Sequence, residues 1–149
     1  MGASYENDVI AWANEQAQLL RSGQLTLLDI EHIAEEIEDV GKSEQRELAN
    51  RMAVLLAHLI KWEYQPMLRC ASWESTIHAQ RNSIDRRIHK TPSLKASLAD
   101  DDWWADAWGD AVVEESKETG MDYRSFPDTC PWSAEKVLDR AYFPAARGV

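Results

Sequence analysis

Hydrophobic residues recur every three or four positions in the stretch DIEHIAEEIEDVGKSEQRELANRMAVLLAHLIKWEYQP, which begins at Asp29. This spacing places apolar side chains along one side of a helix, and the other helices of the chain are expected to cover that stripe. Gly41 weakens a helix and Ser43 can cap a new one, so the pattern favours two helices, 29–40 and 44–64, over one long bent helix. The stripe consists of Ile30, Ile33, Ile37, Val40, Leu48, Met52, Leu55, Leu59 and Trp62.

The same spacing predicts four further helices, at about 5–21, 73–90, 94–118 and 134–140. The acidic run 100–102 interrupts the apolar pattern of the third of these and indicates a kink or a split there. Side chains that can accept the free amides of a first turn, and residues that end helices, mark the boundaries. The expected caps are Asp29, Ser72, Ser93 and Ser133, and the expected stops are Gly23, Pro66 and Gly120.

These elements predict an all-α fold, a helical bundle of five to six helices, because the sequence contains no stretch with the alternation of a β-strand. The loop 121–132 is expected to pack onto the bundle through Phe126 and Trp132. The helices at 29–40, 44–64 and 73–90 are expected to form the core layer, with those at 5–21 and 94–118 laid against it.

The length and composition are those of an ordinary globular protein. The chain has 149 residues, with 44% hydrophobic and 28% charged residues, which suits one domain spanning 1–149 with frayed ends at 1–4 and 145–149. Seven tryptophans is a high number for this length, and such large side chains usually fill the gaps between helices.

The charge of the chain restricts its partners. A formal net charge of −10 repels nucleic acid phosphates and anionic membrane surfaces, so we expect neither as a partner. The excess acid is either solvated surface or a means of recognising a basic protein. No apolar run is long enough to span a membrane, and no signal peptide is evident. Cys70 and Cys130 lack the paired spacing of zinc or redox sites, which favours a reduced, cytoplasmic protein.

Several segments together resemble the bacterial family known as domain of unknown function number twenty-nine, over most of the chain from Tyr5 to about Pro144. The resemblance implies a small bacterial protein with a helical fold. It implies no activity, cofactor or catalytic residue, because none is established for the family. The sequence departs from the family pattern around 100–104. The matching segments are AEEIEDVGKSE (34–44), LLAHLIKW (55–62), Ser72-Trp73, Thr76-Ile77, Gln80-Arg81, Phe126-Pro127, Cys130-Pro131-Trp132 and Val137-Leu138-Asp139.

One candidate site follows from polar residues within apolar stripes. Arg81 lies one turn after Ile77 and therefore on the buried side of its helix, where an unpaired charge would cost several kcal/mol. We expect it to be paired in a cluster that either fixes the register of the helices or binds a small anion or carboxylate. The expected cluster consists of Glu36, His58, Gln80 and Arg81, walled by Trp62 and Trp73.

Enzymatic chemistry has little support in the sequence. Asp29, His32 and Glu36 lie along one edge of a helix, and His58 and His78 are further candidate ligands on other helices. The order of residues lacks the Glu-x-x-His pattern of helical metal sites. No nucleophile motif or phosphate-binding loop is present. We therefore expect no metal and no cofactor.

The favoured function is a non-enzymatic interaction or structural protein that contacts itself or a basic protein partner. Trp103 and Trp104 are adjacent on a helix and cannot both face the same core, so one is expected either to be exposed at a protein contact or to pack under a loop. The alternatives are a small-anion or carboxylate binding module built on Arg81 and, third, a metal-dependent enzyme.

Overall fold

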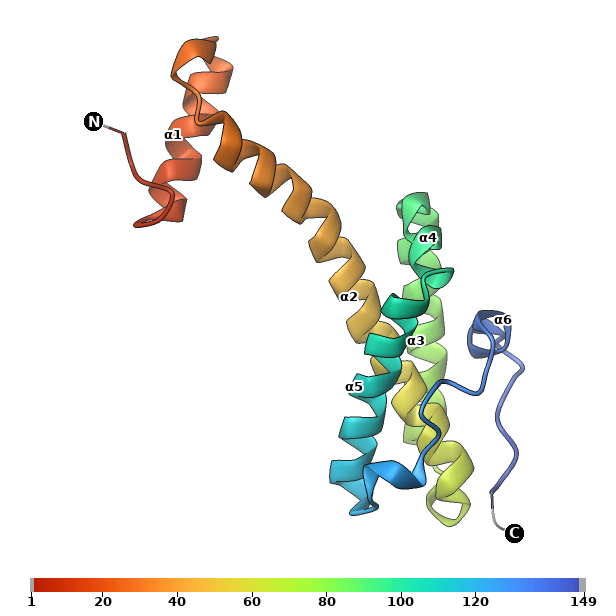
Figure 1. Cartoon of the computed structure of the whole chain (residues 1–149). Coiled ribbons are helices and arrows are strands. Elements are labelled where there is room, and N and C mark those ends of the chain that lie inside the picture. The colour runs from red at the N-terminus through yellow and green to blue at the C-terminus, as the bar shows by residue number, and fades with distance from the viewer. Residues whose placement is uncertain (1, 148–149) are drawn as a thin grey trace. The chain divides into compact units, whose positions relative to one another are not determined.

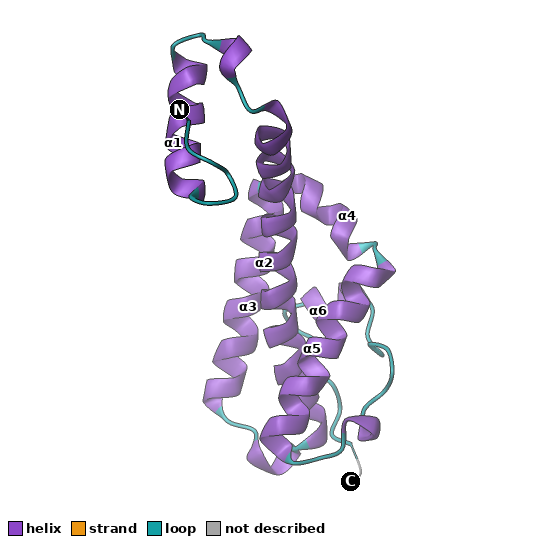
Figure 2. Ribbon diagram, turned by 60° about the vertical axis from the view of Figure 1, so that its left-hand side comes forward, coloured by secondary structure: helices purple, strands orange, loops and turns teal. Residues whose placement is uncertain are grey.

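The computed structural model describes residues 2–147, and this part of the chain contains helices and connecting loops but no strand (Figures 1 and 2). The predicted all-α fold is confirmed. None of these helices is long and apolar enough to cross a lipid bilayer. Over the described residues the six α-helices are α1 (Val9–Arg21), α2 (Ile30–Tyr64), α3 (Ala71–Lys90), α4 (Lys95–Leu98), α5 (Asp101–Thr119) and α6 (Ala134–Leu138).

Contacts along the chain define two compact units, Met1–Ser43 and Glu44–Val149, a division that the sequence did not indicate. The first unit contains α1 and the N-terminal part of α2, and the second contains everything from the C-terminal part of α2 onward. Within the first unit, α1 packs against the start of α2, which the sequence analysis assigned to the core layer. The predicted frayed ends, 1–4 and 145–149, lie partly outside the described residues. Within the described part, the Ala3 amide donates to the Glu15 carboxylate and the Arg147 amide donates to the backbone carbonyl of Glu63.

The core of the second unit is built by α2, α3 and α5, which run in alternating directions (Figure 1). Their apolar side chains recur at helical spacing and are almost fully buried, which supplies the main stabilising free energy of the unit. As predicted, Phe126 and Trp132 are buried and hold the loop after α5 onto the helices. The buried residues of the three helices are Leu48, Met52, Leu55, Leu56, Ala57, Leu59, Ile60, Ile77, Ile84, Ala107, Trp108, Ala111 and Val112.

Local signals explain most helix ends. Asp100 accepts hydrogen bonds from the amides of Asp102 and Trp103, so the acidic run splits the predicted helix 94–118 into α4 and α5. Gly23 and Gly120 both have φ of 73°, the left-handed geometry expected of helix stops. The predicted cap Ser72 is wrong, because α3 begins at Ala71 and Cys70 precedes it.

Trp103 and Trp104 are both half-buried, with indole rings 5.5 Å apart in an edge-to-face arrangement. The indole N–H of Trp103 donates to the carbonyl of Gln45, and that of Trp104 donates to the carbonyl of Leu98. The expectation that the pair cannot face the same core is wrong, since both rings pack against the core of the second unit. This pair offers no fully exposed aromatic surface for a partner.

The predicted break at Gly41 is wrong, because α2 is one continuous helix from Ile30 to Tyr64. A glycine inside a helix costs only about 1 kcal/mol relative to alanine, whereas a break would sacrifice several backbone hydrogen bonds. Glu38 and Lys42 also stand at the i, i+4 spacing that favours helix formation. These two local effects outweigh the weak stop signal of one glycine.

Replacement of Gly41 tests this continuity. Gly41→Ala is expected to stabilise the protein by about 1 kcal/mol, because alanine has the higher helix propensity and a Cβ there would meet no atom within 4 Å. Chemical denaturation followed by far-ultraviolet circular dichroism measures the change. Gly23→Ala is the matched control: its site is equally open, but its φ of 73° makes alanine destabilising by about 1 kcal/mol. A destabilising Gly41→Ala would instead indicate a helix break.

In the first unit, the apolar stripe of α2 is not covered by other helices, contrary to the prediction. Ile30, Ile37 and Val40 are 67%, 67% and 66% exposed, and Ile33 alone of the predicted set is partly buried. Since α1 packs near the start of α2 through Trp12, it leaves this apolar side of the helix free.

Candidate functional site

Arg81 is buried on α3, as the sequence predicted, with 1% of its surface exposed. Its partners are backbone carbonyls rather than the expected carboxylate. The guanidinium donates to the carbonyls of Val137 at 2.8 Å, Tyr142 at 2.7 Å and Arg140 at 3.5 Å, and it lies 5.4 Å from the ring centre of Phe143. Arg81 therefore fastens the segment that contains and follows α6 onto the bundle.

The other predicted site residues make no hydrogen bond to Arg81 within residues 2–147. Glu36 belongs to the first unit and accepts a hydrogen bond from Tyr5 at 2.6 Å. The ring of His58 bonds through Nδ1 to the carbonyl of its own helix at Val54, 2.9 Å away. Gln80 has a buried side-chain oxygen with no hydrogen-bond donor among residues 2–147.

The two predicted wall residues have separate surroundings. Trp62 packs against Phe143 at 4.8 Å between ring centres, next to the Arg81 contact, whereas Trp73 lies under the ammonium of Lys61 at 5.4 Å. The predicted cluster of Glu36, His58, Gln80 and Arg81 is thus not formed by hydrogen bonds within the described residues. Binding of an anion at Arg81 stays a prediction.

The residues considered for a metal site have other contacts. Asp29 and His32 bond directly to each other, with Oδ2 and Nδ1 2.7 Å apart. Within residues 2–147, no group of three or more His, Cys, Asp or Glu side chains is arranged to hold a metal ion. Cys130 is half-buried in its loop, and its thiol donates to the carbonyl of Trp132.

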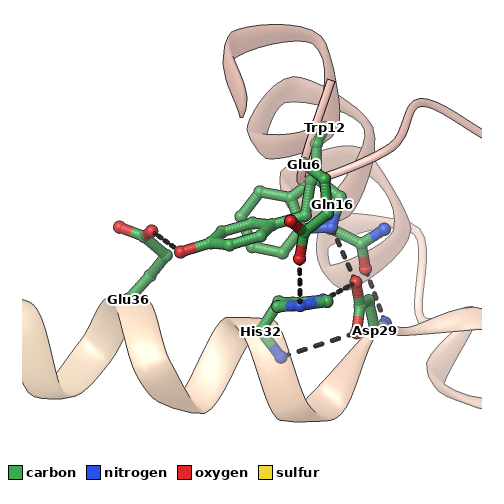
Figure 3. Close-up of polar contacts among 7 residues, drawn as sticks. Glu6, Trp12, Gln16, Asp29, His32 and Glu36 are labelled. Atoms are coloured by element: carbon green, nitrogen blue, oxygen red, sulfur yellow. Dashed lines mark hydrogen bonds and ion pairs between the residues drawn. The ribbon is translucent and has the colours of Figure 1, made fainter. Parts of the chain in front are cut away.

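A polar network joins α1 to the start of α2 in the first unit (Figure 3). The Trp12 indole donates to Asp29 Oδ2 at 2.9 Å, and the Asp29 amide donates to Gln16 Oε1 at 2.8 Å. The Tyr5 ring stacks on His32 with 4.1 Å between ring centres. These contacts fix the two helices of the unit and account for the burial of Trp12 and Gln16.

The charges in this network stabilise one another. The hydrogen bond to Asp29 raises the pKa of His32, and the same bond lowers the pKa of Asp29. The hydrogen bond from Tyr5 to Glu36 raises the pKa of Tyr5 to about 12. The stabilising contribution of His32 is therefore lost as the pH rises through its folded-state pKa, and that of Asp29 is lost as the pH falls through its own. The network therefore has a structural role, because it holds α1 against the start of α2.

A different group of titratable residues lines a cleft of about 320 Å³ between α2 and α5 in the second unit. Glu115 is its most unusual member, because the side chain is 0% exposed and neither carboxylate oxygen has a hydrogen-bond donor among the described residues. Burial raises the pKa of Glu115 to about 7. The cleft is lined by Asn50, Ala53, Val54, Ala57, His58, Lys61, Asp110, Glu114, Glu115 and Glu118.

Lys61 provides the positive charge in this cleft, but its ammonium is held away from Glu115. It lies 2.5 Å from Glu118 Oε2 and 3.8 Å from Glu115 Oε1, which is beyond hydrogen-bond distance. Burial lowers the pKa of His58. The bond from His58 Nδ1–H to the carbonyl of Val54 leaves Nε2 of the neutral ring as an acceptor.

The sequence analysis missed Glu115, although its position carried a signal. It follows Val112 by three residues and Trp108 by seven, so it lies on the apolar side of α5. A carboxylate in that register is expected to be buried and to need a partner. Lys61, next to the buried Ile60, has the same kind of position on α2.

The fold and these sites define an all-α helical-bundle protein with a structural arginine clamp and one acidic cleft. The chain belongs to the DUF29 family, since the family model described as "Domain of unknown function DUF29" matches residues 4–143. The resemblance noted in the sequence is thus confirmed. No curated protein and no solved structure matches the chain.

Proposed function

We propose that this protein is a non-enzymatic interaction protein that binds a partner helix along the exposed apolar face of α2 formed by Ile30, Ile37 and Val40. The supporting observation is that these three large side chains are about two-thirds exposed on one side of a regular helix. Burying a side chain of this kind contributes about 1.5 to 3 kcal/mol, so covering all three would supply useful binding free energy.

The charges beside this face favour a basic partner. Glu31, Glu35, Glu38 and Asp39 accompany the apolar residues along the same part of α2, and all four are exposed. A second copy of the chain would bring the same acidic residues to the contact if the helices paired in parallel. An amphipathic helix with an apolar stripe flanked by lysine or arginine complements both the apolar face and its charge.

A pair of synthetic helical peptides tests the proposal. Both have about 18 residues and the same leucine stripe, and their flanks carry either lysine or glutamate. Isothermal titration calorimetry is expected to show binding of the lysine-flanked peptide alone. The double variant Ile37→Gln/Val40→Gln keeps the charge and the helix propensity of α2, and it is expected to weaken that binding at least tenfold.

Two results would contradict this proposal. Equal binding to the wild type and to the double variant would show that charge alone attracts the peptide. A stable dimer in light scattering that the double variant abolishes would show that a second copy covers the face, so that self-association replaces the basic partner.

The proposal includes a cytoplasmic location in a bacterial cell. The two cysteines, Cys70 and Cys130, are both free thiols, which suits a reducing compartment.

A further inference from the structure

We propose that the cleft between α2 and α5 binds an organic cation, an ammonium or guanidinium group on an alkyl stem, whose N–H groups donate to the carboxylate of Glu115. The site lies in the second unit and does not depend on the proposed function of the α2 face in the first.

Glu115 requires a hydrogen-bond donor that the described part of the chain does not provide. Both of its oxygens are buried, and a buried carboxylate without donors costs several kcal/mol in the ionised form. The side chain lines the cleft but both oxygens are covered, so a bound cation must displace neighbouring side chains of the cleft to reach them. A ligand with several N–H donors would satisfy both oxygens.

Lys61 does not fill this role, although it is the nearest cation. Its ammonium is committed to Glu118 at 2.5 Å and to the face of Trp73 at 5.4 Å. At 3.8 Å from Glu115 Oε1 it is too far away to donate to that oxygen, and Glu115 Oε2 has no donor among the described residues either. The missing donor is therefore expected to come from outside the chain.

The rest of the cleft suits an alkyl cation. Asp110, Glu114 and Glu118 add negative charge from α5, and the neutral His58 ring adds an acceptor nitrogen from α2. Ala53, Val54 and Ala57 supply an apolar wall for a hydrocarbon stem. A volume of about 320 Å³ accommodates a short chain with one charged head group.

A divalent metal fits this cleft less well. Lys61 places a positive charge 3.8 Å from Glu115, where it would repel a second cation of higher charge. The acidic side chains of the cleft also do not converge on one point, since the described residues contain no group of three potential metal ligands. A monovalent ammonium or guanidinium group meets half of this repulsion and needs no convergent set of ligands.

Calorimetric titration of the full chain at pH 8 tests the site with three probes. 1,4-Diaminobutane represents a free amine, N-acetyl-lysine methylamide represents a protein-borne side chain, and MgCl₂ represents a metal ion. At least one of the two amines is expected to bind with one equivalent, and their relative affinities identify the natural source. Binding is expected to weaken about tenfold from pH 8 to pH 6, because protonation of Glu115, whose pKa is about 7, removes the acceptor.

Matched variants distinguish this site from general attraction to an acidic protein. Glu115→Gln is expected to weaken amine binding at least tenfold and to remove its dependence on pH. Asp101→Asn, which removes one exposed charge elsewhere on α5, is expected to leave the affinity within twofold. Val54→Phe narrows the cleft without changing its charge and is also expected to weaken binding at least tenfold. Thermal melting confirms that each variant is folded.

The proposal is overturned if neither amine binds at about 10 mM. It is also overturned if Asp101→Asn weakens binding as much as Glu115→Gln does, or if MgCl₂ binds more tightly than both amines. Unchanged amine affinity in a folded Val54→Phe variant would place the bound cation outside the cleft.

Discussion

Arg81→Met is expected to lower the free energy of unfolding by about 4 kcal/mol. The variant keeps the volume and the apolar stem but removes all donors from three backbone carbonyls, at Val137, Arg140 and Tyr142. Two of these bonds are short, and hydrogen bonds to a charged group contribute about 1.5 to 3 kcal/mol each when an acceptor would otherwise be left unsatisfied. Urea denaturation followed by circular dichroism measures the loss.

Two further variants test whether the loss of stability comes from the hydrogen bonds of the Arg81 guanidinium. Arg86→Met, five residues further along α3 at an exposed position, is expected to change stability by less than about 0.5 kcal/mol. Arg81→Lys keeps the charge but not the planar fork of donors, and it is expected to recover only part of the loss. In Arg81→Met the amide of Val137 should exchange hydrogen faster than in the wild type. A loss below about 1 kcal/mol would show that other contacts hold this segment.

Hydrophobic spacing predicted the helices of the second unit well, because their stripes are buried within the same unit. Leu48, Met52 and Leu55 on α2 and Ile77 and Ile84 on α3 are all fully buried. The spacing reports only that one side of a helix is apolar, so it could not distinguish this core from the exposed side of the N-terminal part of α2. Ile37 and Val40 satisfy the same rule as Leu48, and only the packing of α1 elsewhere reveals the difference.

The candidate site was only half predictable for a related reason. The burial of Arg81 followed from its distance of one turn from Ile77, and the structure confirms it. Its partners could not be predicted, because they are backbone carbonyls. Every residue carries one, so the sequence does not indicate which of them accept a hydrogen bond from Arg81. The predicted helix break at Gly41 was wrong for a similar reason. One glycine is a weak signal for the end of a helix, and the helix-forming residues on both sides keep α2 continuous.

Glu115 makes the stability of the folded state depend on pH in the direction opposite to most carboxylates. Its pKa rises from 4.5 to about 7 on folding because burial disfavours the ionised form. Between these two pH values the folded state binds more protons than the unfolded state, so stability falls as the pH rises. The total loss corresponds to about 3 kcal/mol.

Glu115→Gln is therefore expected to be more stable than the wild type at pH 8, by up to about 3 kcal/mol, and to approach it at pH 4.5. The neutral amide resembles the protonated acid in size and is not penalised for charge. Urea denaturation across this pH range measures the difference. Glu114→Gln, an exposed carboxylate on the rim of the same cleft, is the control and should shift stability by less than about 0.5 kcal/mol at either pH. A constant difference between wild type and Glu115→Gln from pH 4.5 to 8 would mean that Glu115 ionises in the folded protein as it does in the unfolded chain, with a donor already beside it.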